Sequence, residues 1–269
     1  MDQPVLRSLY ASFESLRDAF KSYFDFLTSV HEHTDTMSFV AGAYVRTMLL
    51  LLTSVAVGSL VGVGLGLISG LRPGSKLAGA ASYVSFLGVL TPSFLLGIIV
   101  LLVFVRYISP AFGVRFVLLD PTVGIIDPRR LIAPAMVLSV RPMAFMTQVT
   151  IGALQEVIHR DYVRTAYAKG LRYPTILWRH ILPNIALPML TALNSSFFFA
   201  LSSIFVIEWL FNWSGVGFYL LESVLARDSL LASYLLVSIA VTVFLINTLI
   251  KLAIRQIDKR ITEVDAVVS

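Results

Sequence analysis

The sequence predicts an all-α membrane protein, a polytopic helical bundle with about five transmembrane helices. Of the 269 residues, 57% are hydrophobic and only 14% are charged, and the mean hydropathy is +0.83. These values are too apolar for a soluble domain with a polar surface. Charge-free runs recur along the chain at roughly the 20 residues that a membrane-spanning helix needs. Charged residues gather between the runs, above all at residues 156–184.

The composition also limits the kinds of site that the chain can carry. There is no cysteine, which excludes disulfides, a thiolate zinc site and a cysteine nucleophile. The formal net charge is +5, and in so apolar a chain a basic excess indicates membrane topology more than nucleic-acid binding. A P-loop would need Gly-Lys-Ser/Thr, whereas this chain has Gly74-Ser75-Lys76. We therefore expect contact with membrane lipid, and no metal, cofactor or nucleic acid.

Two parts of unequal size are expected. Residues 1–40 form an amphipathic segment at the membrane interface, because apolar residues recur there at helical spacing between charged ones. Residues 41–269 form the transmembrane domain, and its first crossing is expected at about Thr47 to Leu71. Glycines fall at every fourth position of this crossing, so that a second helix can approach one of its faces closely. They are Gly58, Gly62, Gly66 and Gly70.

The second and third crossings each carry an unusual residue. The second is expected at about Ala78 to Val105, kinked by Pro92, since proline removes a backbone hydrogen bond. The third is expected at about Leu131 to Gln155 and contains Arg141. A charge at mid-membrane costs on the order of 2.5–3.5 kcal/mol, so Arg141 should face the bundle interior, water or a partner chain. Both a functional role and a structural ion pair with a partner stay open.

The last two crossings enclose a segment rich in aromatic residues and glycine. The fourth is expected at Ile185 to about Ile207 and the fifth at about Ser229 to Ile250. The segment between them belongs at the membrane–water boundary, where tryptophans are enriched. Together with the two residues above, it supplies the candidate pore or gate residues, which are Pro92, Arg141, Glu208, Gly215 and Gly217.

The distribution of positive charge predicts the orientation. If residues 156–184 lie in the cytoplasm, eleven Lys and Arg fall on the cytoplasmic side and five in the outer loops. Cytoplasmic segments carry the excess of Lys and Arg. The segment and the C-terminus are therefore expected in the cytoplasm, and the N-terminal segment outside.

Residues 156–184 have the pattern of a docking element. A helix from about Glu156 to Lys169 is expected to end at Gly170 in the left-handed conformation. A second short helix would be opened by Pro174 and closed by Pro183. Exposed apolar residues with basic flanks at a membrane surface favour docking of a soluble partner. A loop that lies on the surface is the alternative.

Several of these motifs resemble one family. Thr165-Ala166-Tyr167-Ala168-Lys169-Gly170, followed by Leu182-Pro183, resembles the EAA loop of inner-membrane permease subunits of ATP-binding-cassette importers. DYVRTAYAKGL at residues 161–171 is similar to the version in the oligopeptide/dipeptide/nickel branch, and segments 91–97, 131–139 and 206–228 resemble its B-type permease. The similarity covers roughly Val45 to Arg260. Thr165 stands where the broader motif has Glu, and Ser214 replaces the proline usual before Gly-x-Gly.

The resemblance implies a non-catalytic permease subunit of an ATP-driven, binding-protein-dependent importer, with peptides as the leading cargo. ATP and Mg would be bound by two cytoplasmic ATPase subunits, and a second permease chain and an extracytoplasmic binding protein would complete the complex. Residues 156–184 would form the coupling loop in a groove of an ATPase subunit. The residues implied for docking and coupling are Asp161, Val163, Arg164, Thr165, Ala166, Tyr167, Ala168, Gly170, Trp178, Leu182 and Pro183. The alternative is a self-sufficient secondary transporter, which would be expected to show internal repeats.

Overall fold

The computed structural model describes residues 34–72, 74–108 and 128–257, and all of the regular structure in these ranges is helical. The chain divides into two units, residues 1–42 and 43–269. The predicted amphipathic segment lies almost entirely outside the described residues, as do most of the loop predicted at 106–130 and the end of the basic C-terminal tail. The elements in chain order are α2 Thr34–Leu71, α3 Lys76–Leu90, α4 Ser93–Val103, the π-helical turn η2 Phe104–Ile108, α6 Pro128–Ile158, α7 Asp161–Ala168, α8 Tyr173–Ile176, the π-helical turn η4 Leu177–Ile181, α9 Leu182–Leu210, α10 Val216–Leu225 and α11 Ser229–Ile257.

The expected membrane character is confirmed. Among the described residues, four helical stretches are long and apolar enough to cross a membrane, and α3 with α4 would add a fifth if the bent pair is one span. The four are Thr36–Leu71, Arg130–Ile158, Tyr173–Leu210 and Ser229–Ile254. Many large apolar side chains on these helices are exposed, such as Leu60 on α2 and Phe244 on α11. Lipid is the natural environment for such a surface.

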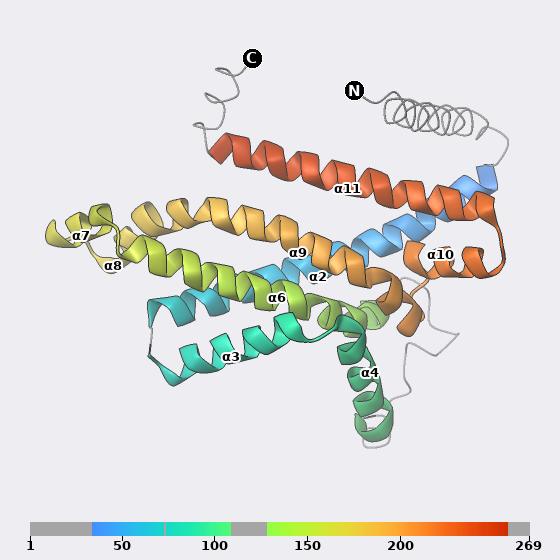
Figure 1. The fold of residues 1–269 in the computed structure, drawn as a ribbon, viewed down its shortest axis with the longest axis horizontal. Coiled ribbons are helices and arrows are strands. Elements are labelled where there is room, and N and C mark those ends of the chain that lie inside the picture. The colour runs from blue at the N-terminus through green and yellow to red at the C-terminus, as the bar shows by residue number, and fades with distance from the viewer. Residues whose placement is uncertain (1–33, 73, 109–127, 258–269) are drawn as a thin grey trace, which may run out of the picture. The chain divides into compact units, whose positions relative to one another are not determined.

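The α6–α9 pair is the centre of the bundle. Figure 1 shows these two helices side by side, with α11 along α9, and α3 contacts α6 from another side. Their buried side chains form a large apolar core with residues of α2, including Leu50, Leu138, Ile204 and Ile207. Phe211 and Trp213 close this core beyond the end of α9 and are each only 1% exposed.

The first crossing is longer than predicted. The predicted start at Thr47 was set by the charge of Arg46, but α2 is already helical from Thr34. The Arg46 side chain does not end the helix because its Nε donates a 2.5 Å hydrogen bond to the Ser214 carbonyl oxygen. A satisfied guanidinium can therefore continue an apolar span.

The second crossing is broken where the sequence predicts only a kink. Helices α3 and α4 meet at 105°. Thr91 and Pro92 between them are both extended, with ψ of 124° and 134°. A proline drives the residue before it out of the helical region, and here the whole helix ends instead of bending.

Helices α6 and α9 both extend beyond the predicted crossings and contain prolines. In α6 these are Pro134 and Pro142. In α9, Pro183 lies near the first turn and does not end the preceding helix as predicted. The wider π-helical turn η4 comes just before it, and such a turn relieves the clash of a proline ring with the preceding turn. As a result, residues Tyr173–Leu210 form one continuous helical run.

Candidate functional site

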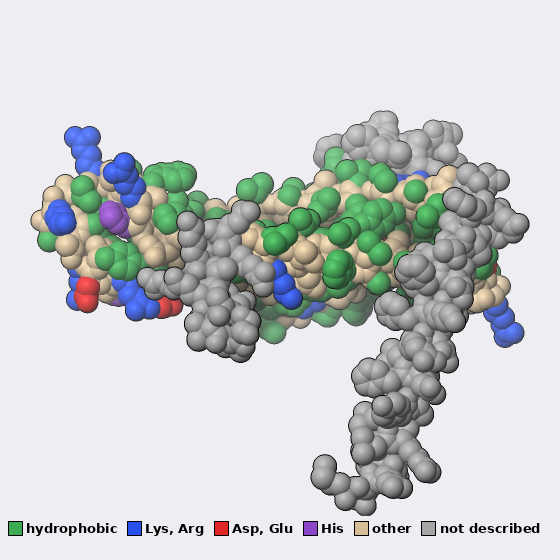
Figure 2. Space-filling model, turned by 90° about the horizontal axis from the view of Figure 1, so that it is seen from above, with side chains coloured by type: hydrophobic (Ala, Val, Ile, Leu, Met, Phe, Trp, Pro, Cys, Tyr) green, Lys and Arg blue, Asp and Glu red, His purple; other side chains and the backbone are tan. Residues whose placement is uncertain are grey.

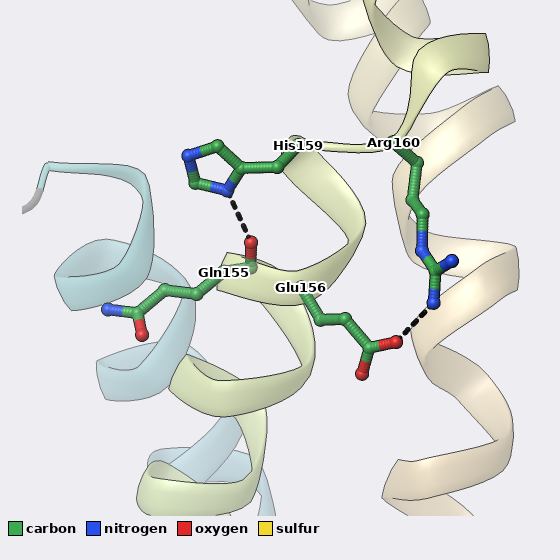
Figure 3. A network of polar contacts seen from close by, with 4 residues as sticks. All are labelled: Gln155, Glu156, His159 and Arg160. Atoms are coloured by element: carbon green, nitrogen blue, oxygen red, sulfur yellow. Dashed lines mark hydrogen bonds and ion pairs between the residues drawn. The ribbon is translucent and has the colours of Figure 1, made fainter.

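The charged segment begins with a sharp break between α6 and α7. The predicted helix from Glu156 to Lys169 is wrong in its bounds, because α6 runs on to Ile158 and α7 starts only at Asp161. Figure 3 shows how the end of α6 is capped: His159 Nδ1 lies 2.7 Å from the Gln155 carbonyl oxygen, and Arg160 pairs with Glu156. The first contact uses a carbonyl group near the helix end, where carbonyls lack partners within the helix, and the second joins two side chains one turn apart.

The other end of α7 is closed by Gly170, in the conformation that the sequence predicts. Gly170 has φ +72°, in the left-handed region. Its N–H donates to the Tyr167 carbonyl at 2.9 Å, and the Leu171 N–H donates to the Ala166 carbonyl at 3.3 Å. This pair of bonds is the Schellman arrangement, which satisfies the last carbonyls of a helix and reverses the chain.

A separate apolar cluster fixes α7 and α8 to the ends of the long helices. It consists of Leu154, Val157, Val163, Ala166, Ile176, Ile181 and Ile185. Val163 and Ile176 are fully buried, and Ala166 is 4% exposed. The expectation that Val163 supplies contact area to a partner is therefore wrong: α7 is strongly amphipathic, and Val163 lies on the face turned toward α6 and α9. Ala166 can influence a partner only through the position of α7.

We call residues 160–181 the α7–α8 element. Its outer face carries aromatic and basic side chains. Trp178 is 71% exposed and Tyr167 is 48% exposed. Among the other predicted docking residues, Val163 and Ala166 are buried as described above and Leu182 is half-buried, while the rest are exposed. Figure 2 shows Lys and Arg gathered at this end of the molecule, while hydrophobic side chains cover the middle. The basic residues of the element are Arg160, Arg164, Lys169, Arg172 and Arg179.

An open groove of about 550 Å³ lies beside this face. Its walls come from the end of α6, the start of α7 and the start of α9. They combine charged and polar side chains, among them Glu156, Arg160, Asp161 and Asn184. The exposed face and the groove together form a mixed polar and aromatic surface, which suits a protein partner better than a small apolar ligand.

The glycine stripe of α2 is placed against α6. A methyl group at Gly58 would lie 2.6 Å from the Ser139 carbonyl oxygen, and one at Gly62 would lie 2.5 Å from the Met143 carbonyl oxygen. Gly66 meets Thr150 and Gly70 meets Leu154 in the same way. The Thr147 hydroxyl also donates to the Gly62 carbonyl at 3.2 Å. These two backbones can approach so closely only because the side chains are absent.

Three of the candidate gate residues predicted from the sequence meet at one buried corner. They are Glu208, Gly215 and Gly217. The Glu208 carboxyl group is fully buried at the end of α9. Its Oε2 accepts the Gly217 N–H at 2.7 Å and the Phe218 N–H at 3.1 Å, and its Oε1 accepts the Thr47 hydroxyl at 2.6 Å. The Thr47 oxygen in turn accepts the Val216 N–H at 2.7 Å. The first turn of α10 is thereby tied to both α9 and α2.

Sequence reasoning missed two members of this corner, Thr47 and Arg46. Thr47 is separated from Glu208 by 161 positions, and a threonine at the edge of an apolar run gives no signal of its own. Arg46 binds the Ser214 carbonyl, and its own carbonyl accepts the Trp213 Nε1–H at 3.1 Å. The only available signal was that a charge stands beside an apolar span.

Arg141 and Pro92 do not join this corner. The guanidinium carbon of Arg141 lies 5.0 Å from the centroid of the Phe199 ring on α9, within the range of a cation–π contact. Phe145 meets the same ring edge-on at 5.2 Å. Within the described part of the chain, Arg141 faces α9 and has no acidic partner. Pro92 lies at the α3–α4 break described above.

Known proteins that are similar to this chain in sequence include permease proteins of peptide transport systems. The oligopeptide transport system permease protein AppB of Bacillus subtilis is 31% identical over 241 residues, which cover 88% of this chain and 76% of AppB. The dipeptide transport system permease protein DppB of the same organism is 30% identical, over 88% of this chain and 75% of DppB. Among solved structures, a chain of the inward-facing MetNI methionine ABC transporter matches with a TM-score of 0.63 at 16% identity. That match covers 84% of this chain and 99% of the other, and it supports the fold.

A family model matches most of the transmembrane part. It is described as the binding-protein-dependent transport system inner membrane component, and it matches residues 62–263. This range includes the α7–α8 element, the α6–α9 pair and Glu208, whereas Thr47 and Arg46 of the corner lie before it. The chain therefore belongs to the family of inner-membrane components of binding-protein-dependent transport systems.

Proposed function

We propose that this chain forms half of the membrane path of an ATP-driven importer for peptides, with a second, related permease chain as the other half. Its family membership supports a role in binding-protein-dependent transport. The peptide cargo is supported by the names of the AppB and DppB relatives, each of which matches 88% of this chain. An extracytoplasmic binding protein would deliver the peptide.

The α7–α8 element would dock into a cytoplasmic ATPase subunit, one of two in the complex. The observation that carries this proposal is an exposed aromatic and basic face mounted on a fully buried apolar base. A rigid base means that little conformational entropy is lost on binding. Trp178 and Tyr167 are of the residue types that dominate interface energies, at about 2 kcal/mol or more for a central aromatic side chain.

This docking requires the α7–α8 element, and with it the C-terminus, to lie in the cytoplasm. The gathering of Lys and Arg at the α7–α8 end supports that orientation. ATP and Mg²⁺ would be bound by the ATPase subunits, and this chain would have no catalytic residue of its own. Its role would be mechanical. Movement received at α7–α8 would change the side of the membrane to which the path is open.

The peptide would pass along the face of α6 and α9 that carries Arg141. This side chain is half-buried near the middle of α6, where a guanidinium without an acid partner needs water or an anionic ligand. The contact with Phe199 holds it toward α9. The carboxylate of a passing peptide is an anion of suitable chemistry.

Reconstitution tests the whole proposal. The chain is co-expressed with its second permease and its ATPase subunits. Co-purification is measured, together with ATP-dependent uptake of radiolabelled trialanine into proteoliposomes supplied with the binding protein. We expect Trp178→Ala to lower ATPase co-purification by about tenfold, as is typical for an interface hot spot. The matched control is Phe244→Ala on α11, which removes an aromatic side chain of similar exposure, 68% against 71%, and should leave co-purification unchanged.

Two results would contradict the proposal. Equal loss with Trp178→Ala and Phe244→Ala would show that the docking face lies elsewhere. Peptide uptake by the purified chain alone, driven by an ion gradient without ATP, would favour the secondary-transporter alternative.

A further inference from the structure

The docking element and the Glu208 corner lie at opposite ends of one helix. Residues Tyr173–Leu210 form a continuous helical run of 38 residues, roughly 55 Å long at the rise of an α-helix. The run begins inside the α7–α8 element and ends at the corner. Neither the π-helical turn η4 nor the prolines of α9 interrupt it. Movement applied at one end can therefore reach the other without crossing a loop.

The far end of this run is joined to its neighbours by hydrogen bonds. Glu208 binds two N–H groups of the first turn of α10, and Thr47 bridges Glu208 to the Val216 N–H. Thr47 is 2% exposed and Glu208 is fully buried. We call Thr47, Glu208 and the N–H groups of residues 216–218 the α9–α10 clasp.

The clasp is too tightly packed to accept a methyl group at either glycine beside it. A methyl group at Gly215 would collide with both Glu208 and Thr47, and one at Gly217 would lie 2.8 Å from Phe205 Cα and 3.0 Å from Glu208 Oε2. A second layer encloses it, because Arg46 binds the Ser214 carbonyl and Trp213 binds the Arg46 carbonyl. The first turn of α10 is thus held in one position relative to both α9 and α2.

The remainder of α10 is held much less firmly. Val224 is 60% exposed and Leu225 is 75% exposed. The helix ends at Leu225, and Arg227, two positions further on, has φ +58°. Helix α10 packs on α9 and α11, and the clasp adds hydrogen bonds from its first turn to α9 and α2. The position of that first turn therefore depends on the clasp.

We propose that Thr47 and Glu208 are positioning residues of transport: the clasp transmits movement of the α8–α9 run to α10 and α2 at the opposite face of the membrane. This inference rests on the proposed function, because it takes the docking element as the place where the movement begins. Without the clasp, the run would still move, but α10 and α2 would no longer follow it. ATP hydrolysis would then continue without import.

Thr47→Val tests the clasp with a nearly unchanged side-chain shape. It removes the hydroxyl group that donates to Glu208 and accepts from Val216. We expect trialanine uptake by the reconstituted complex to fall by about fivefold or more, as for loss of a buried hydrogen bond. Co-purification of the ATPase subunits and ATP hydrolysis should stay close to those of the unaltered chain. Thr47→Ser keeps the hydroxyl group and should retain uptake.

Thr242→Val is the matched control. Thr242 is 1% exposed, and its hydroxyl group also bonds to α2, at 2.9 Å from the Tyr44 hydroxyl oxygen, but outside the clasp. A general effect of removing a buried hydroxyl group would lower uptake in both variants, and this result would overturn the inference. Loss of ATPase co-purification in Thr47→Val that Thr47→Ser does not restore would likewise assign the clasp a purely structural role.

A distance measurement supplies a readout that stability alone does not move. The chain has no cysteine, so spin labels can be attached at Met136→Cys on α6 and Leu225→Cys on α10, which are 64% and 75% exposed, with cysteine-free partner subunits. Pulsed EPR should show an ATP-dependent change in this distance in the unaltered and Thr242→Val chains but not in Thr47→Val. The same change in all three would overturn the inference. Absence of ATP-dependent uptake in the unaltered complex would instead overturn the proposed function.

Discussion

The two ends of the α8–α9 run are built by opposite means. At the α7–α8 end, a small apolar cluster is buried and the polar and aromatic groups point outward. At the clasp, polar groups are buried and satisfy one another, while apolar side chains surround them. Apolar packing tolerates small shifts because it is non-directional, whereas a buried polar network fixes distances and angles. The contrast distinguishes an end that is held by apolar packing and exposes polar and aromatic groups from an end that is held by directional hydrogen bonds.

The largest effect should come from removing the buried acceptor of the clasp. Glu208→Leu leaves the N–H groups of Gly217 and Phe218 and the hydroxyl group of Thr47 without an acceptor. We expect about 3–5 kcal/mol of destabilisation, since each buried group left unpaired costs about 1–3 kcal/mol. Thermal unfolding of the purified complex in detergent measures it. Glu208→Gln retains a carbonyl oxygen for the two N–H groups and should cost about 1 kcal/mol. Equal effects of the two changes would mean that shape, not hydrogen bonding, holds the corner.

At the opposite end, burial and exposure should separate stability from docking. Ile176→Ala removes a fully buried side chain of the apolar cluster and should cost about 2–4 kcal/mol in the same unfolding measurement. Trp178→Ala, two positions away, removes an exposed side chain and should change stability by less than about 0.5 kcal/mol, although ATPase co-purification should fall. If Trp178→Ala destabilised the fold as much as Ile176→Ala, the outer face would be part of the core.

The glycine stripe allows a comparison within one helix. At Gly62, a methyl group would lie 2.5 Å from the Met143 carbonyl, while at Gly64 nothing lies within 4 Å. Gly62→Ala should therefore cost about 1–3 kcal/mol through overpacking, and Gly64→Ala should be neutral or slightly stabilising because alanine favours the helix. Unfolding temperatures of the two variants decide this. Destabilisation by both would point to a requirement for flexibility instead of close approach.

A smaller loss of stability than for Glu208→Leu, Ile176→Ala or Gly62→Ala is expected at the turn between α7 and α8. No atom lies within 4 Å of a methyl group placed at Gly170, so substitution there acts only through the backbone. Gly170→Val should cost about 1–2 kcal/mol, because a side chain opposes the left-handed conformation, and it should weaken ATPase co-purification. Gly170→Asn is the control, since asparagine tolerates positive φ. If Asn and Val weakened co-purification equally, the turn would need glycine for close approach of a partner.

Much of the fold follows from local and compositional signals. The apolar runs, the basic segment between them and the glycines spaced by four each reflect a constraint that acts along a single helix. The positive φ of Gly170 belongs to the same group, because a helix stop depends on the few residues around it. The predicted helix bounds were less accurate. The break at residues 159 and 160 and the continuous run through Pro183 depend on how the backbone groups at helix ends find hydrogen-bond partners, and several arrangements fit the same residues.

Side-chain orientation in the charged segment could not be read with the same accuracy. Val163 and Tyr167 are both apolar or aromatic residues of α7, yet one is fully buried and the other is 48% exposed. Their difference depends on which face of α7 meets the ends of α6 and α9. A short helix of eight residues does not determine that face until its neighbours are in place.

The sequence alone determined that this chain is a multi-pass helical membrane protein with a charged segment between two apolar crossings, because hydropathy and charge act on every residue whatever its neighbours are. Only the tertiary structure decided that Glu208 and Thr47, 161 positions apart, form one clasp, and that α10 is held by it. Hydrogen bonds between distant segments form only when the helices have packed, so the spacing of residues along the chain does not predict them. The sequence therefore specifies the membrane helices, and their packing determines how a movement at one end would reach the other.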